Sequence, residues 1–269
     1  MQTPSKAQSK KTDSLFQQRH PPGSPTQTAT SASTSISPKP TSPSPYIKPL
    51  SSYLDLEKVS ALPKRELEYI WRLRHASDPL SLCAVIPIET YNRIQRTARS
   101  HPQFILPVPS PETDDTGEGK KGATPTPGSG SWTAADIHFL QWAFHPPIIG
   151  AAGPELTTLN THTSTVIFTH LASYKLRGEY APPHTTITHH LDLADSHGVV
   201  LLNGSVMRGS GVSVEEGRWL VMCLQKFYDF EGQGSGVGRD KRQNLLEKFS
   251  KGDQDFTLKE LVDEAERAS

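Results

Sequence analysis

The stretch 164–203, STVIFTHLASYKLRGEYAPPHTTITHHLDLADSHGVVLLN, constrains the fold of this chain more than any other. Its apolar runs at 166–168 and 199–202 are typical of buried strands, and β-branched residues alternate with other types after residue 184 as in a strand. Between the first run and this alternation lies a short amphipathic segment, which we expect to form a turn or a helix that ends at Gly178. The order strand, helical crossover, strand, turn, strand predicts the core of a mixed sheet.

The flanking sequence adds helices and further strands to this core. Apolar residues at helical spacing predict helices at 55–62, 63–76 and 87–100, a helix capped by Ser213 with Glu216 in the capping-box position, and two C-terminal helices, the second capped by Thr257. Apolar runs predict a buried strand at 81–86, an edge strand at 104–108 that Pro107 interrupts, and a central strand at 135–144. We therefore expect a single α+β domain.

Composition divides the chain into a tail and a domain. Residues 1–49 are rich in Ser, Thr, Pro and Gln, with six basic residues and a single acid, Asp13. Such a segment buries too little apolar surface to offset chain entropy, so we expect it to be disordered. It fits either a mitochondrial targeting region or a plain low-complexity tail. We expect residues 50–269 to form the domain, with a disordered Gly/Pro-rich insertion at about 109–131.

Charge and apolar content limit the classes of partner. The formal net charge is zero and the isoelectric point is about 7.2, which argues against bulk attraction to nucleic acid or an anionic membrane. The sequence contains no run of about eighteen apolar residues, so we expect no membrane insertion. Cys83 and Cys223 lie far apart in apolar runs. They fit two buried free thiols better than a disulfide.

The histidines near the central stretch invite a metal or acid/base hypothesis. The candidates are His162, His170, His184, His189, His190 and His197. His189 and His190 are neighbours on an expected strand and therefore point to opposite faces, and no HExxH or paired CxxC motif accompanies them. Asp192 and Asp195 could complete an acid/base cluster with His190, but no GxSxG nucleophile motif is present. We assign no catalytic, cofactor or metal residues; a metal-dependent or acid/base enzyme using His184 to Asp195 remains the alternative.

Several separate segments resemble one family in the same order along the chain. They include YLDLEKV at 53–59, ELEYIWRLRH at 66–75, IHFLQWAF at 137–144, FTHLASYKLRGEYAPPHTTITHHLDLAD at 168–195 and LLEKFSKGDQDFTLKELVDEA at 245–265. The chain resembles the mitochondrial ATP synthase F(1) complex assembly factor 1 family. The resemblance implies an α+β fold with a largely antiparallel sheet flanked by helices.

The resemblance also implies a function. It points to a matrix chaperone, not an enzyme, that binds unassembled F(1)-ATPase β subunit and needs no cofactor. We expect a monomer. An unassembled subunit exposes apolar interface, so its chaperone should offer a contact that is apolar at the centre and polar at the rim.

The expected contact surface rests on aromatic and Arg residues, which are enriched at interface hot spots. The predicted contact residues are Tyr53, Leu54, Trp71, Arg72, Phe104, Ile105 and Leu106. The competing interpretation is that Trp71 and Phe104 belong to the core, and the sequence favours it.

Overall fold

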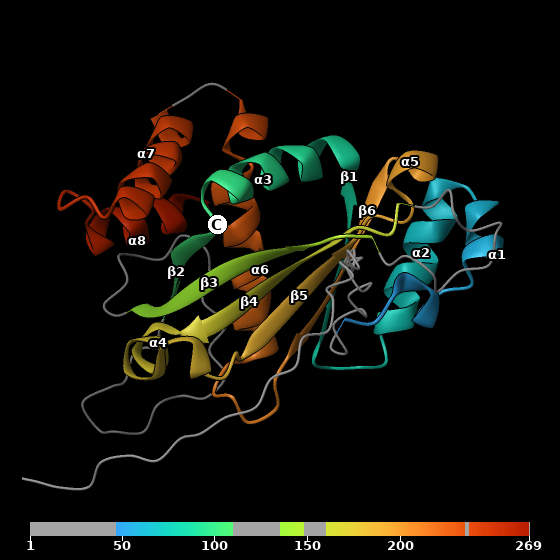
Figure 1. Cartoon of the computed structure of the whole chain (residues 1–269), viewed down its shortest axis with the longest axis horizontal. Helices are drawn as coiled ribbons and strands as arrows, with labels where there is room; N and C mark the ends of the chain where they lie inside the picture. Colours follow the sequence, from blue (N-terminus) through green and yellow to red (C-terminus); the bar gives the residue numbers. More distant parts are fainter. Residues whose placement is uncertain (1–46, 110–134, 148–159, 235–236, 269) are drawn as a thin grey trace, which may run out of the picture. The chain divides into compact units, whose positions relative to one another are not determined.

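The computed structural model describes residues 47–109, 135–147, 160–234 and 237–268, and the fold is built on one six-stranded sheet (Figure 1). The strands are β1 (Ser81–Pro87), β2 (Gln103–Pro109), β3 (Ala135–His145), β4 (Thr163–His170), β5 (Thr185–His190) and β6 (Val199–Val206). Their order in the sheet is β1-β6-β5-β4-β3-β2, and every pairing is antiparallel. The α+β class and the largely antiparallel sheet that the resemblance implied are therefore confirmed, and the sheet expected to be mixed has no parallel pairing among the described strands.

Eight α-helices and three short 3-10 turns accompany the sheet in the described part of the chain. The helices are α1 (Leu56–Ser60), α2 (Lys64–His75), α3 (Ile88–Ser100), α4 (Leu171–Arg177), α5 (Ala194–His197), α6 (Val214–Tyr228), α7 (Val237–Lys251) and α8 (Leu258–Ala268). The 3-10 turns are η1 (Leu50–Ser52), η3 (Gly178–Tyr180) and η4 (Phe230–Gln233). None of the helices among these residues is long and apolar enough to cross a membrane.

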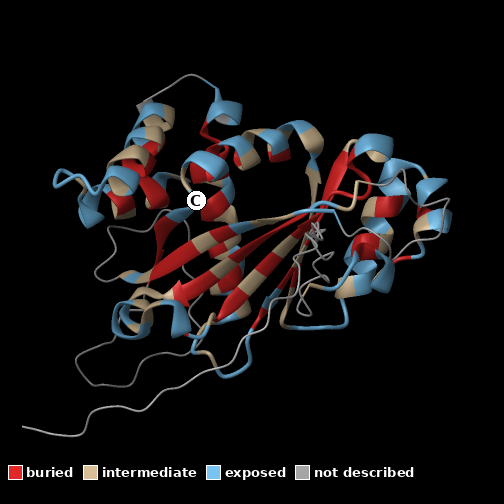
Figure 2. Ribbon diagram, viewed as in Figure 1, coloured by how far each residue is buried: buried red, intermediate tan, exposed pale blue. Residues whose placement is uncertain are grey.

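The strands are largely buried (Figure 2), and the alternation of side chains along them gives the sheet two apolar faces. On β6, Val199 and Leu201 join the apolar cluster of α1 and α2, whereas Leu202 joins the main core with α6. The main core also holds Phe104 and Phe168 and receives apolar residues from α7 and α8. Helices therefore cover both faces of the sheet. The strand order leaves β1 and β2 as the sheet edges, and the edge position predicted for Pro107 in β2 is confirmed.

The helix ends follow the predicted local signals. Ser213 caps α6 by accepting the Glu216 N–H, while the Glu216 carboxylate accepts the Ser213 N–H at 2.6 Å, so the predicted capping box is present. Thr257 Oγ1 accepts the Glu260 N–H at 3.3 Å and caps α8 as predicted. The backbone of Gly178 has a φ of 60° at the C-terminus of α4, a conformation that favours glycine.

One predicted connection is wrong. The helix after β4 does not act as a crossover to a parallel strand, because β5 returns antiparallel to β4. A helix of seven residues rises only about 10 Å and does not run back along a strand of eight residues, about 26 Å long. This helix, α4, instead turns the chain at one end of the sheet.

Most of the predicted tail (1–49) and insertion (109–131) lies outside the described residues. Both cysteines are free, as favoured from the sequence; Cys223 is buried and Cys83 is half-buried.

Candidate functional site

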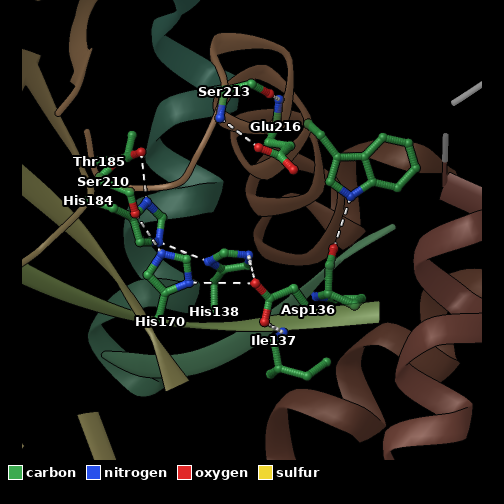
Figure 3. Close-up of polar contacts among 11 residues, drawn as sticks. Asp136, Ile137, His138, His170, His184, Thr185, Ser210, Ser213 and Glu216 are labelled. Atoms are coloured by element: carbon green, nitrogen blue, oxygen red, sulfur yellow. Dashed lines mark hydrogen bonds and ion pairs between the residues drawn. The ribbon is translucent and has the colours of Figure 1, made fainter. Parts of the chain in front are cut away.

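The antiparallel register brings three histidines and one carboxylate together at one end of the sheet (Figure 3). His138 of β3 lies directly opposite His170 of β4, and Asp136 is two residues before His138, so all three side chains point to the same face. His184 precedes β5, and its backbone N–H donates to the backbone carbonyl of Phe168, which fixes the residue beside the same two strands. We call Asp136, His138, His170 and His184 the histidine cluster.

Hydrogen bonds orient each ring of the histidine cluster. His138 Nδ1 lies 2.9 Å from His184 Nε2, and His184 Nδ1 lies 2.9 Å from Thr185 Oγ1. The second ring nitrogen of His138, Nε2, faces Asp136 Oδ2 at 4.0 Å. These contacts form a continuous polar chain that runs from a buried threonine to an exposed carboxylate.

His170 joins the cluster from the end of β4. His170 Nε2 lies 3.1 Å from the Ser210 carbonyl, and because a carbonyl only accepts, Nε2 carries the hydrogen. In a neutral ring, Nδ1 of His170 therefore holds a lone pair, and it lies 3.6 Å from Asp136 Oδ2. The tautomer of His170 is thus set by its backbone partner.

Burial controls the protonation of the inner rings. Desolvation lowers the pKa of His138 to about 4, an effect that the Asp136 carboxylate partly opposes. Desolvation, with the neighbouring His138 and His170, lowers the pKa of His184 to about 3. At neutral pH both rings are therefore neutral and keep a nitrogen lone pair. Neutral imidazoles beside a carboxylate can hold a metal ion.

The structure separates the histidines of the alternative site predicted at His184 to Asp195. His184 joins the histidine cluster, but His189 stacks on Trp142 in the main core, with ring centroids 5.5 Å apart. His190 points to the other face, where its ring centroid lies 5.9 Å from that of Tyr53. The opposite orientation predicted for the two neighbouring histidines is confirmed. Asp192 is buried, and desolvation raises its pKa to about 6.

The sequence interpretation missed two members of the histidine cluster, Asp136 and His138. Their spacing of two residues on a predicted strand was the available signal, because it places both side chains on one face. It gave no indication of which residue on another strand would lie opposite them.

The predicted contact residues occupy two different environments. Leu54, Trp71, Phe104, Ile105 and Leu106 are buried, so the core interpretation of Trp71 and Phe104 is confirmed. The indole N–H of Trp71 donates to the Leu202 carbonyl at 3.1 Å, which ties α2 to β6. Tyr53 is half-buried and accepts a hydrogen bond from the Asn203 amide at 2.9 Å, whereas Arg72 is exposed on α2.

The exposed face of α2 carries apolar side chains beside Arg72. Tyr69 and Leu73 are 69% and 60% exposed and lie four residues apart, so they are neighbours on the helix surface. Where α2 ends, a pocket of about 360 Å³ opens beside β1, with Arg72 and Arg218 in its lining. We call Tyr69, Arg72 and Leu73 the α2 surface.

The fold and the site give the class of the protein, and the comparison with known families gives its family. Fold and site define an α+β protein with one antiparallel sheet, an oriented histidine cluster and an apolar helix surface. The family model described as ATP11 protein matches residues 1–262, and the chain belongs to this family.

The matched part of each curated relative is shorter than the whole relative. It is 32% identical over 213 residues to "Protein atp11, mitochondrial" of Schizosaccharomyces pombe, which covers 79% of this chain and 61% of that protein. It is 23% identical over 221 residues to "ATP synthase mitochondrial F1 complex assembly factor 1" of Homo sapiens, covering 82% of this chain and 52% of that protein. The Danio rerio protein of the same name is 24% identical over 221 residues, with 82% and 57% covered. The chain thus spans between half and two thirds of the length of these relatives.

Proposed function

We propose that this protein is a mitochondrial assembly factor for F(1)-ATPase that binds the unassembled β subunit and keeps it soluble. The observation that carries the proposal is the match of the ATP11 family model to residues 1–262. The names of the human and zebrafish relatives add F1 assembly and the mitochondrion. We further propose that residues 50–269 act as one chaperone domain in the matrix, and that this domain works by binding and not by catalysis.

The α2 surface is the part of the molecule that we propose contacts the β subunit. Tyr69 and Leu73 offer exposed apolar area, and Arg72 is of a type enriched at hot spots. Acidic and basic residues occupy neighbouring positions on α2, which gives the surface a polar rim. Of the seven contact residues predicted from the sequence, this proposal retains Arg72, with Tyr53 as a half-buried support beneath α2.

A second exposed apolar pair provides a matched control. Leu176 and Tyr180 are 81% and 83% exposed and lie at the other end of the sheet, on α4 and η3. Replacing either pair leaves the buried core untouched, so the two double variants differ only in which surface they alter.

The test is suppression of β-subunit aggregation, followed by light scattering as β subunit is diluted from denaturant into the full chain. We expect suppression by the wild type and by the Leu176→Glu/Tyr180→Glu variant. For Tyr69→Glu/Leu73→Glu we expect the concentration needed to rise by about tenfold or more, the size typical of a lost hot spot. Equal suppression by both variants would remove the α2 surface from the proposal, and failure of the wild type would refute the function.

A further inference from the structure

We propose that the histidine cluster binds one Zn²⁺ ion through His138 Nε2, His170 Nδ1 and a carboxylate oxygen of Asp136. These three atoms lie within 4.8 Å of one another. No property of the family or of the proposed chaperone function requires such a site, so the inference stands on the geometry alone.

The ligand set selects the class of metal. Two imidazoles and one carboxylate are a common donor set for zinc in proteins, whereas Mg²⁺ and Ca²⁺ prefer oxygen ligands throughout. The ligands come from two paired strands, because the pairing of His138 with His170 and the spacing from Asp136 place them on one face. A metal ion here would link β3 to β4 at the end of their ladder.

The distances need only small side-chain movements. Bonds of about 2.0–2.1 Å at tetrahedral angles separate two donors by about 3.3 Å. Asp136 Oδ2 lies 3.6 Å from His170 Nδ1 and 4.0 Å from His138 Nε2. The Asp136 side chain is 59% exposed, and its Oδ1 accepts the Ile137 N–H at 3.1 Å, which leaves Oδ2 to face both rings. The two ring nitrogens lie within 4.8 Å of each other and must approach to about 3.3 Å to share an ion.

The outer hydrogen bonds already present the required lone pairs. His170 Nε2 donates to the Ser210 carbonyl, so its Nδ1 is the free acceptor. His138 Nδ1 pairs with His184 Nε2, and His184 Nδ1 pairs with Thr185 Oγ1; in the tautomer in which His138 Nδ1 donates, His138 Nε2 is free to bind a metal ion. Outer partners of this kind fix the tautomer of zinc-bound histidines.

Three protein ligands leave at least one coordination position, on the exposed side of Asp136, for water. Glu216 is a nearby carboxylate and acts electrostatically on His138, but its Oε2 already accepts the Ser213 N–H in the cap of α6. Glu216 therefore adds negative charge around the ion without being a ligand.

The experiment uses the untagged full chain, stripped with chelator and dialysed. Isothermal titration with Zn²⁺ measures stoichiometry and affinity, and Co²⁺ absorbance reports the ligands. We expect one equivalent of zinc per chain and Co²⁺ bands of a nitrogen/oxygen site without thiolate charge transfer. The Asp136→Asn and His170→Ala variants should each weaken binding by about tenfold or more, because each removes a ligand from a set of three.

The control is His145→Ala, at the other end of β3, where His145 Nε2 lies 2.9 Å from Thr165 Oγ1. It removes a hydrogen-bonded histidine from the same strand and should leave zinc binding unchanged. Thr185→Val tests the outer chain and should weaken binding by about tenfold. No saturable binding, binding by Asp136→Asn and His170→Ala that is as strong as that of the wild type, or a thiolate band with Co²⁺ would overturn the proposal.

Discussion

Acidification from pH 7 to pH 5 should destabilise the native state because two buried histidines resist protonation. His189 lies between Tyr91 and Trp142, with ring centroids 5.4 and 5.5 Å away, and its Nδ1 is 3.2 Å from Ser164 Oγ. Desolvation lowers the pKa of His189 to about 3. The core therefore holds this ring in its neutral form.

His190 makes the same contribution on the opposite face of the sheet. It is buried, and neither of its ring nitrogens has a hydrogen-bond partner among the described residues. Desolvation, with a smaller effect of His75 of α2, lowers its pKa to about 4. Protonation of His190 would place an unpaired charge beside Tyr53 in a largely apolar layer.

The sign and size follow from proton linkage. Both folded pKa values are depressed, so below pH 6.5 the unfolded chain binds more protons, and stability falls as the pH falls toward 4 and 3. At pH 5 each histidine costs about 2 kcal/mol, or about 4 kcal/mol together. Asp192 opposes this, because its folded pKa is raised to about 6 and its protonation returns about 1 kcal/mol over the same range. These three groups give a net loss of about 3 kcal/mol. His138 and His184, whose folded pKa values are about 4 and about 3, add about 2 kcal/mol each by the same linkage, so the whole loss is about 7 kcal/mol.

Urea unfolding followed by tryptophan fluorescence between pH 7.5 and 5 measures this loss. Because it removes one titrating group and no hydrogen bond, His190→Phe should flatten the profile by about 1.4 kcal/mol per pH unit near pH 5. His162→Gln, at an exposed position, controls for the loss of a histidine from the unfolded chain. A wild-type free energy of unfolding that is constant from pH 7 to 5, or an unchanged slope in His190→Phe, would refute the reasoning.

Three further substitutions test how the helices are held. Gly217→Ala would place a Cβ 2.8 Å from Val206 Cγ2, and we expect a loss of about 1–3 kcal/mol in urea unfolding from this overpacking. Ser213→Ala removes the cap of α6 and should cost about 1 kcal/mol by the same measurement. Arg242→Met removes one partner of the buried pair with Glu264, 2.9 Å apart, and should cost about 3–5 kcal/mol; a loss below about 1 kcal/mol would contradict this role.

Local signals in the sequence predicted much of the fold because they depend on neighbouring residues. The capping box of Ser213 and Glu216, the edge position of Pro107, and the opposite orientation of His189 and His190 each follow from short-range geometry. The segment 171–180 shows where this approach fails. Its helical spacing was predicted correctly, but the direction of the next strand depends on the length of the connection relative to the strands.

The histidine cluster depends on information that is not local. His138 and His170 meet only through the register of β3 and β4, and no short hairpin turn fixes that register from the sequence. The contact prediction failed to separate core from surface on α2 for a related reason. Trp71 has the composition of a hot spot, but burial against Leu202 removes it from the surface and leaves Tyr69 and Leu73 exposed.

Binding of the purified full chain to isolated F(1) β subunit, isolated α subunit and assembled F(1) is the decisive measurement of the proposed function. Sedimentation velocity at a series of concentrations gives each affinity without immobilising either partner. The account predicts a one-to-one complex with the isolated β subunit, with a Kd of about 1 μM or tighter, and at least about tenfold weaker binding to the other two. No complex with the β subunit, or equal binding to assembled F(1), would contradict it.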